Sequence, residues 1–489
     1  MTKQENRQEA KKITFNVSKE NSFSEWYSEI VEKAEITDLR YNVKGFVVIR
    51  PWGAMLIENM YKIYEKELQK TGHMPTFFPT VIPEENFKKE AGHVEGFTPQ
   101  VFWLKEIGEE KLALRPTSET AFYQLYSSWI RGLADLPLKL YQRANVFRLE
   151  TKATRPLIRA REFLWIEAHD AFSSKEEAEE QVQEDIAMTE KIMHQKFLVP
   201  FLPMKRPEWD KFPGAEYTIG SDTIMPDGKI IQQPSTHLLG QHFSKAFDIR
   251  FQDEKGESQY VWQTCYGPAI SRILASVISM HGDDSGLVLP FSISPIQVVI
   301  IPIFNEKNSK KVLGEAEKIE KELEKAGIEA KIDSRESRPG EKFFFWEMKG
   351  VPLRIELGEK EINNHELTLY SRDNKEKLKI KNKNLAEEIK KQGMKLDARL
   401  LERADKKFKD SIANCKTKQE VSKALENKKI ARFSFCSVKK DGEECAGFIE
   451  KELQARVMGT RHDKKEKAEG KCIICNKKAG EIVYAARSY

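Results

Sequence analysis

The sequence predicts a multidomain α/β protein, a polar arm followed by three folded units, and three observations support this class. The chain has 489 residues, well beyond the size of about 250–300 residues at which a single hydrophobic core stops growing. Segments with helical spacing of apolar residues alternate with short apolar runs of strand length. The composition changes after Asp283 and again at a Lys-rich stretch that begins near Lys390. We expect an arm over residues 1–20 and units over residues 21–290, 291–400 and 401–489.

Bulk composition predicts a soluble globular protein of the cytoplasm. Charged residues make up 32% of the chain, and the mean hydropathy is −0.58. The strongest apolar run, Val298 to Phe304, is far short of the ~20 residues that span a bilayer. The N-terminus lacks the apolar segment of a secretory signal. The 81 Lys and Arg residues exceed the 76 Asp and Glu residues by 5, which leaves room for a locally basic face but does not require a nucleic-acid partner.

In the first unit, apolar periodicity and proline positions predict helices and an edge strand. Glu25–Ala34 and Gly53–Lys70 place apolar residues at helical spacing, and Gly45–Pro51 predicts a short strand closed by proline. Prolines interrupt the segment His73–Thr80, which suits a strand at the edge of a sheet. Hydroxyl groups followed by carboxylates predict a helix from Ser173 to about Phe197.

In the second unit, strands and helices alternate beyond the linker prolines Pro290 and Pro295, which predicts a small, mostly parallel or mixed sheet. The expected elements are the strand Gln297–Ile303, the helix Asn308–Ala326, the strand Glu329–Ile332, the helix Glu341–Lys349 and the strand Leu353–Leu357. Four consecutive aromatic residues, Phe343 to Trp346, can stack on bases or pack in the core. Core packing is favoured, because at least two of four successive helical residues point inward.

The segment from Ala113 to Phe172 carries the most chemical information. It contains Arg148-Leu149-Glu150 and, after a charged loop, a second segment from Arg159 to Phe163. A fixed guanidinium can bind a phosphate, a carboxylate can accept a hydrogen bond from the adenine amino group and an aromatic ring can stack on the base. This inventory suits ATP bound on an open antiparallel sheet, without the glycine-rich GxxxxGK[ST] loop, which the sequence lacks. The alternative is a strand whose Arg and Glu merely pair with each other.

This strand–loop–strand pattern closely resembles motif 2 of the class II aminoacyl-tRNA synthetases. Gly267–Arg272, which leads into an apolar helix, resembles motif 3, although Ala269 stands where many of these enzymes have a second glycine. The helix and edge strand over Gly53–Pro83 resemble motif 1, which implies a homodimer. Thr117–Glu119 and Phe163–His169 resemble the prolyl-tRNA synthetase family of the archaeal and eukaryotic type. The resemblance implies a class II catalytic core, an antiparallel sheet flanked by helices.

For ATP, the resemblance implies a set of charged residues rather than a general base. Arg148 would bridge the amino-acid carboxylate and the α-phosphate, Arg272 would cover the opposite face, and both are the expected catalytic residues. Glu150 would lie near the adenine amine or Mg²⁺. The other expected ATP-binding residues are Arg159, Phe163, Gln232 and Ser235, the last a serine where the family has threonine. A carboxylate is already ionised at pH 7, so positioning and charge neutralisation by arginines and Mg²⁺ supply most of the acceleration.

For the amino acid, the resemblance implies a pocket for L-proline. Thr117 and Glu119 would accept the two N–H donors of the secondary ammonium, and Trp165 would form a wall against the ring. The other expected contacts are Arg148, Glu167, His169 and His237. The loop His93–Pro99 resembles the mobile segment that closes over bound proline in this family.

The C-terminal half would bind tRNA(Pro) and one metal ion. By resemblance, residues 291–400 form an α/β anticodon-binding domain in which Glu347 and Arg354 present a carboxylate and a guanidinium to guanine edges. The spacing of a cysteine pair, Cys-x2-Cys, lets both sulfurs reach one tetrahedral ion. Four cysteines therefore predict a structural Zn²⁺ site in a small α/β C-terminal domain: Cys436, Cys445, Cys472 and Cys475. We expect Cys265 and Cys415 to be simply buried.

The resemblance implies a ligase that activates proline with ATP to prolyl-adenylate and pyrophosphate and then transfers the prolyl group to the 3′ end of tRNA(Pro). The segment between Phe172 and Val261 leaves no room for a separate editing domain, and Tyr489 resembles a C-terminal tyrosine that reaches towards the active site. A threonyl enzyme would need a zinc ligand set in its catalytic domain, and the sequence suggests none. A catalytically inactive RNA-binding relative should have lost Arg148, Glu150 or Arg272, and all three are present.

Overall fold

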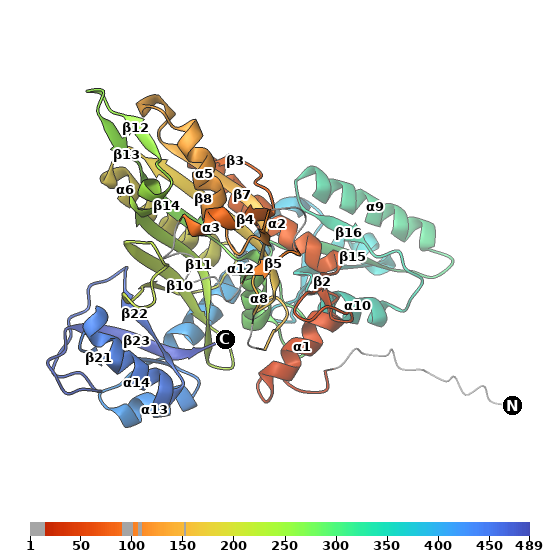
Figure 1. Cartoon of the computed structure of the whole chain (residues 1–489). Helices are drawn as coiled ribbons and strands as arrows, with labels where there is room; N and C mark the ends of the chain where they lie inside the picture. The colour runs from red at the N-terminus through yellow and green to blue at the C-terminus, as the bar shows by residue number, and fades with distance from the viewer. Residues whose placement is uncertain (1–14, 90–100, 106–109, 151–152) are drawn as a thin grey trace.

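The computed structural model describes residues 15–89, 101–105, 110–150 and 153–489. These residues form three units, and the first unit lies between the other two (Figure 1). The helix α12 (Leu385–Asp410) leads from the second unit to the third and runs without a break across residue 400. The expected boundary at that residue therefore falls within one helix.

An antiparallel sheet forms the centre of the first unit. Its strands are ordered β9–β10–β11–β14–β8–β7, with β3 as a short parallel strand at the edge beside β7. Prolines in the segment after His73 cannot donate ladder hydrogen bonds, so only two residues of the expected edge strand pair. The strands are β3 (Met74–Pro75), β7 (Leu138–Phe147), β8 (Glu162–Phe172), β9 (Leu202–Lys205), β10 (Tyr217–Ile224), β11 (Lys229–Gly240) and β14 (Trp262–Gly267).

Helices cover this sheet, and one of them is buried on nearly every side. Nine residues of α8, from Ile270 to Ser279, are buried between the sheet and its neighbour α2. A helix that is buried on nearly every side holds its first turn rigidly, and that turn carries Arg272. The long helices of the unit are α1 (Phe23–Lys33), α2 (Pro51–Lys70), α5 (Glu119–Trp129), α6 (Lys175–Thr189) and α8 (Ile270–His281).

The helix expected from Ser173 begins as predicted but ends early. Ser174 accepts a hydrogen bond from the Glu177 amide at 3.2 Å, and the Glu177 carboxylate accepts one from the Ser174 amide at 3.2 Å. This reciprocal cap fixes the start of α6. The helix ends in a π-helical turn, η3 (Glu190–His194), before Phe197.

Small elements complete the first unit. The strand expected over Gly45–Pro51 shortens to a two-residue pairing between β1 and β2. These elements are β1 (Thr37–Asp38), β2 (Val48–Ile49), β4 (Val81–Pro83), α3 (Glu84–Lys88), β5 (Phe102–Trp103), β6 (Leu112–Leu114), η2 (Leu133–Asp135), α7 (His242–Ala246), β12 (Arg250–Gln252) and β13 (Ser258–Tyr260).

The second unit contains the mixed sheet that the sequence predicts. Its order is β16–β15–β17–β18–β19; β15 is parallel to both neighbours, and the last two pairings are antiparallel. Of the aromatic run, Trp346 is buried, and Phe343 and Phe345 pack against the same core cluster, as core packing requires. The elements are β15 (Val298–Ile303), α9 (Ser309–Lys325), β16 (Ala330–Ile332), α10 (Pro339–Lys349), β17 (Leu353–Gly358), α11 (Glu359–Asn364), β18 (Glu366–Ser371) and β19 (Lys377–Lys381).

The C-terminal unit continues the central sheet. Its strands add the order β20–β21–β23–β22 to the edge strand β9, and the end of β23 also pairs with β11 through Lys229↔Arg487 and Ile230↔Ser488. The last residues of the chain are therefore held against the first unit. The elements are β20 (Ile412–Asn414), α13 (Lys418–Glu426), β21 (Ile430–Phe435), η4 (Lys440–Gly442), α14 (Glu443–Leu453), β22 (Arg456–Arg461) and β23 (Glu481–Ser488).

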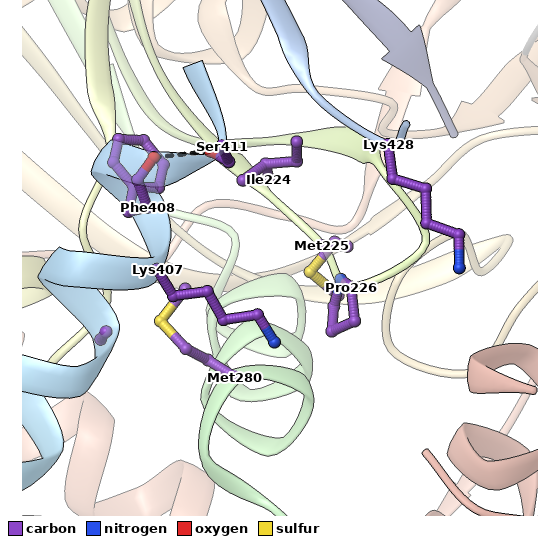
Figure 2. A pocket seen from close by; sticks show the side chains of 9 residues that line it. Ile224, Met225, Pro226, Met280, Lys407, Phe408, Ser411 and Lys428 are labelled. Carbon is purple, nitrogen blue, oxygen red and sulfur yellow. Dashed lines mark hydrogen bonds between the residues drawn. The ribbon is translucent and has the colours of Figure 1, made fainter. Parts of the chain in front are cut away.

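The turn between β10 and β11 lies beside α12 and the end of the chain. Ile224, Met225 and Pro226 line a small apolar cavity of about 80 Å³ together with Phe408 of α12 (Figure 2). Lys407 and Lys428 flank this cavity on two sides in the view. The next residue of the turn, Asp227, accepts hydrogen bonds from the hydroxyl of Tyr489 at 2.8 Å. The turn thus connects the apolar contact with α12 to the end of the chain.

Candidate active site

Two adjoining hollows open on the antiparallel sheet of the first unit. The arginine hollow has a volume of about 390 Å³ and is lined by Arg148, Glu150, Ile158, Arg159, Arg206, Asp222, Ile230, Ile231, Gln232, Arg272, Arg456, Ser488 and Tyr489. The carboxylate hollow has a volume of about 140 Å³ and is lined by Thr117, Glu119, Arg148, Trp165, Glu167, His169, Phe212, Gln232, Ser235, His237, Cys265, Tyr266, Gly267 and Arg272. The two share Arg148, Gln232 and Arg272.

Main-chain carbonyls and an aromatic ring hold the shared arginines in place. Arg148 directly follows β7, and its Nε donates to the Pro116 carbonyl at 3.2 Å. Arg272, in the first turn of α8, donates from Nε to the Ile158 carbonyl at 3.1 Å. The ring of Phe163 lies 5.3 Å from the Arg148 guanidinium and 5.5 Å from that of Arg272. Both cations are therefore fixed on one aromatic side chain.

The arginine hollow concentrates positive charge, part of it on buried side chains. Burial, and after it the nearby Arg148, lowers the pKa of Arg272 to about 10. Glu150 forms an ion pair with Arg159 at 3.9 Å. Confined guanidinium groups at this density form a site for a polyanion such as a triphosphate.

The end of the chain forms one wall of the arginine hollow. A guanidinium N–H of Arg159 donates to the main-chain oxygen of Tyr489. The Tyr489 ring lies 5.7 Å from the Arg155 guanidinium and 5.0 Å from the Lys229 ammonium. The tyrosine therefore reaches the site, as the sequence predicts.

A buried ion pair supports another wall of the arginine hollow. Arg206 donates from Nη2 to Asp222 at 2.7 Å and to the Gln232 side chain at 3.3 Å. A β-carbon added to Gly220 would lie 2.3 Å from Arg206 Nη2, so only glycine leaves room for this side chain. Arg206, Asp222 and Arg456 are lining residues that the sequence did not suggest, because no local motif marks them.

In the carboxylate hollow, Glu167 is the centre of a hydrogen-bond network. Its carboxylate accepts from the Ser118 amide at 3.2 Å and from the Gln142 side chain at 2.8 Å, and His169 Nε2 lies 3.3 Å from it. Burial raises the pKa of Glu167, but the bonds from His169 and Ser118 and the charge of Arg115 outweigh it and hold the pKa below its usual value. The group is therefore a fixed anion.

A second carboxylate, Glu119, faces the same space. It is the first residue of α5, is 3% exposed and accepts a hydrogen bond from the Thr117 hydroxyl. Two buried carboxylates in a hollow of this size favour a small cation. Thr117 holds one oxygen of Glu119 in a fixed direction, which suits a ligand with directed N–H donors.

Aromatic rings form the remaining walls of the carboxylate hollow. A β-carbon at residue 267 would lie 2.6 Å from the Trp165 ring, so Gly267 is required for the close approach of that ring. Phe212 packs on His237 with the ring centroids 4.6 Å apart. Burial, followed by the charges of Arg206 and His169, lowers the pKa of His237 to about 3. His237 is thus neutral at pH 7 and accepts or donates hydrogen bonds without adding charge.

The structure brings together the residues predicted for both ligands. Every residue expected to contact proline lines the carboxylate hollow. The residues expected to bind ATP line one or other hollow, apart from Phe163, which contacts the two shared arginines. The loop His93–Pro99 falls outside the described residues.

The residues expected to read the anticodon lie together in the second unit. Arg354 Nη1 is 3.2 Å from a Glu347 oxygen, and Arg354 Nη2 is 2.9 Å from a Glu356 oxygen. The Arg354 guanidinium contacts the rings of Phe343 and Tyr370, at 4.0 Å and 3.9 Å. Its side chain is 5% exposed, so Glu347 is the more accessible member of the pair.

The four cysteines predicted to hold a metal ion converge in the C-terminal unit. The sulfurs of Cys436, Cys445, Cys472 and Cys475 lie within 4.8 Å of one another. The Ile474 amide points at Cys472 Sγ from 3.5 Å, a bond that supports a metal-bound thiolate. Four thiols at this separation fit a closed tetrahedral Zn²⁺ site.

Comparisons with known proteins agree with this geometry. Residues 102–281 match the family description "tRNA synthetase class II core domain (G, H, P, S and T)", residues 297–392 match "Anticodon binding domain", and residues 418–489 match "Prolyl-tRNA synthetase, C-terminal".

Among the described residues, no helix is both long and apolar enough to span a bilayer.

Individual relatives match over nearly the whole length. A proline–tRNA ligase of Thermofilum pendens is 50% identical over 97% of this chain and 98% of its own length. A proline–tRNA ligase of Pyrococcus abyssi is 44% identical over 96% and 98%. The solved structure of Giardia lamblia prolyl-tRNA synthetase in complex with prolyl-adenylate superposes with a TM-score of 0.93, at 38% identity, over 97% of this chain and 100% of that one.

These matches and the two hollows define a class II aminoacyl-tRNA synthetase, with the class II core, anticodon-binding and C-terminal domains that the sequence predicts. At 50% identity over nearly the full length, the chain belongs to the proline–tRNA ligase family.

Proposed function

We propose that this chain activates L-proline with ATP and transfers it to tRNA(Pro), with the two hollows as the sites of the two small substrates. The observation that carries this proposal is the junction between the hollows: Arg148 and Arg272 line both. A carboxylate held at that junction faces an α-phosphate across the same pair of cations.

In this proposal, a proline carboxylate oxygen attacks the α-phosphorus, the bond to the β-phosphate oxygen breaks, and pyrophosphate leaves. Arg148 and Arg272 neutralise the charge that gathers between the reacting groups. The fixed carboxylates of Glu119 and Glu167 bind and orient the prolinium ammonium. Mg²⁺, when bound with ATP beside Glu150, would supply further charge neutralisation of the phosphates. The 3′-terminal ribose hydroxyl of the tRNA then attacks the activated carbonyl, the bond from that carbonyl to the phosphate oxygen breaks, and AMP and the hydroxyl proton are released.

The alternative, a catalytically inactive RNA-binding relative, has no support, because Arg148, Glu150 and Arg272 all line the arginine hollow. The proposal is tested by aminoacylation of a tRNA(Pro) transcript with labelled proline. We expect ATP-dependent charging that stops when the terminal adenosine is removed. If the protein forms prolyl-adenylate normally but does not charge tRNA(Pro), the assignment of the tRNA is wrong and the assignment of the two small substrates stands.

We also propose that the second unit binds the anticodon. Glu347 is the more exposed member of the ion pair with Arg354, and its carboxylate accepts hydrogen bonds from the edge of a guanine base. Arg354, fixed against two rings, holds that carboxylate in place. Glu347→Gln should raise the KM for tRNA(Pro) and leave adenylate formation unchanged. An unchanged KM would remove Glu347 from the anticodon site.

A homodimer is proposed on the face that carries β3. This strand lies at the free end of the sheet order, and the apolar side chains of Met74 in it and of Phe77 just beyond it are 56% and 86% exposed. Unpaired strand edges and exposed apolar groups favour association. Light scattering should give twice the chain mass of 56.6 kDa. We place the enzyme in the cytoplasm, where its substrates occur.

Misactivation of alanine is expected to go uncorrected within this chain. Residues 173–260 form the helical elements α6, η3 and α7, the central strands β9, β10 and β11 and the β12–β13 hairpin, all parts of the first unit. A pocket shaped for the proline ring discriminates against smaller side chains by only ~1–3 kcal/mol per missing methylene. Purified protein should therefore not deacylate Ala-tRNA(Pro), and measured deacylation would contradict this expectation.

A further inference from the structure

Three potential metal ligands meet on the floor of the carboxylate hollow. Cys265 of β14 pairs directly with His169 of β8, so their side chains lie on the same face of the sheet. Glu119 approaches from the start of α5, and the Cys265 thiol donates to its Oε1 at 3.6 Å. One donor atom of each residue lies within 4.8 Å of the other two. Cys265 is therefore more than a buried residue, because it lines the hollow. The catalytic domain thus holds a candidate zinc ligand set that the sequence did not suggest, and a threonyl enzyme is excluded by the proline–tRNA ligase matches rather than by the lack of such a set.

The donor set and its spacing suit a tetrahedral ion. Thiolate, imidazole and carboxylate are the usual zinc ligands, and three protein ligands with one open position are typical of accessible zinc sites. Bonds of about 2.3 Å to sulfur and about 2.1 Å to oxygen place those two ligands about 3.6 Å apart at a tetrahedral angle. This equals the 3.6 Å between Cys265 Sγ and Glu119 Oε1.

His169 has the carboxylate partner that a metal-binding imidazole usually has. Its Nε2 lies 3.3 Å from a Glu167 oxygen, and its Nδ1 lies 3.3 Å from the Tyr123 hydroxyl. A proton on Nε2 donates to Glu167 and leaves the Nδ1 lone pair for the Tyr123 hydroxyl or for an ion. A carboxylate behind the imidazole fixes the tautomer and strengthens the nitrogen as a ligand.

We propose that Glu119, His169 and Cys265 form a second metal site, which binds a thiophilic divalent cation such as Zn²⁺ or Cd²⁺ in competition with the amino-acid substrate. Competition follows because Glu119 cannot bind the ion and the prolinium ammonium at once. That part rests on the proposed function, whereas binding of the ion does not. With three ligands instead of four thiolates, this site should bind more weakly than the four-cysteine cluster.

Binding is tested by titrating Co²⁺ into the full-length protein and recording the thiolate-to-Co²⁺ charge-transfer band. The four-cysteine cluster is loaded with zinc beforehand. We expect one further equivalent of Co²⁺ with the absorption of a single thiolate. The signal should disappear in Cys265→Ser and persist in Cys415→Ser, which removes a buried cysteine of the C-terminal unit. Zinc content measured before and after shows that the cluster keeps its ion.

The proposal is overturned if wild-type protein shows no such signal, or if Cys265→Ser keeps it. Melting temperature is measured for each variant. If Cys265→Ser does not fold, Glu119→Gln is used as the test variant instead. Its affinity for Co²⁺ should be at least about tenfold below that of the wild-type protein, and a smaller loss would overturn the site.

Activity then tests the competition. Zn²⁺ or Cd²⁺ should inhibit proline-dependent ATP–pyrophosphate exchange, with inhibition relieved by proline but not by ATP. Cys265→Ser should raise the inhibitory concentration at least about tenfold, and Cys415→Ser should not change it. Binding that depends on Cys265, combined with inhibition that proline does not relieve, would confirm the metal site and contradict the placement of proline in this hollow.

Discussion

The two hollows of the first unit adjoin each other, and only the first has a large excess of positive charge: the second balances the two shared arginines with two carboxylates. The arginine hollow, with a volume of about 390 Å³, gathers Arg148, Arg159, Arg206, Arg272 and Arg456. The carboxylate hollow, with about 140 Å³, presents Glu119 and Glu167. A site for a polyanion thus adjoins a site for a small cation, and the shared guanidinium groups lie between them. The contrast indicates that the binding of a polyanion and of an ammonium group, and the alignment of the two substrates, depend on the same few residues.

Removal of Arg148, one of the two shared cations, should have the largest effect on activity, because this side chain lines both hollows. Arg148→Ala is expected to lower the rate of proline-dependent ATP–pyrophosphate exchange by about 10²–10³-fold or more, the usual effect of losing one fixed transition-state contact. The melting temperature should change little. Arg40→Ala is the control, since the Arg40 side chain is 86% exposed and pairs with Asp38. Near-normal exchange in Arg148→Ala would refute the shared role.

A change in the carboxylate hollow alone should separate the two substrates. Glu119→Gln is expected to raise the KM for proline about 10–100-fold, because one charged hydrogen bond contributes about 1.5–3 kcal/mol. The KM for ATP should stay within about twofold of the wild-type value, because Glu119 does not line the arginine hollow. A twofold change corresponds to only about 0.4 kcal/mol of binding free energy. Glu184→Gln, which changes a half-exposed partner of Lys139, is the matched control. Equal effects on both KM values would mean that the hollows are not separate sites.

A change in the wall of the arginine hollow should lower the exchange rate through the ATP site, with the KM for ATP raised and the KM for proline unchanged. Deletion of Ser488 and Tyr489 removes the oxygen that accepts from Arg159 and the hydroxyl bound to Asp227. The exchange rate should fall about tenfold, the equivalent of one charge-assisted hydrogen bond. Tyr489→Phe, which removes only the hydroxyl, should have a smaller effect. A truncated protein with full activity would show that the wall is dispensable.

Loss of the four-cysteine cluster should affect stability more than chemistry, because the cluster lines neither hollow. Cys472→Ser is expected to reduce zinc content and to lower the melting temperature by about 5 °C or more. Cys415→Ser removes a buried thiol of the same unit without touching the cluster. Unchanged zinc content or stability in Cys472→Ser would exclude a structural metal at these cysteines.

Much of the site was predictable because its residues sit on short contiguous segments. Arg148 and Glu150 directly follow β7, and Phe163 lies on its partner β8, so their spacing along the sequence already places them together. Thr117 and Glu119 flank a helix start that brings both to one place. The three-unit α/β class follows from the same local periodicities.

Other features depend on contacts between distant segments, and no local pattern encodes them. Arg206 directly follows β9 and enters the arginine hollow only because Gly220 leaves room for it. Cys265 becomes part of the carboxylate hollow through the register of β14 against β8. The pairing of β23 with β11, which brings Tyr489 to the site, spans more than half of the chain. Short edge elements such as β2 and β3 also differ from the expected strands, since prolines limit their pairing.

The carboxylate hollow, in our proposal, selects proline for attack on ATP held in the arginine hollow. ATP–pyrophosphate exchange with each of the standard amino acids in turn tests it most directly, because exchange requires both sites and no tRNA. We expect strong exchange with proline, weak exchange with alanine or cysteine, and none above background with threonine. Strongest exchange with another amino acid, or no exchange with proline, would show that the carboxylate hollow does not select proline.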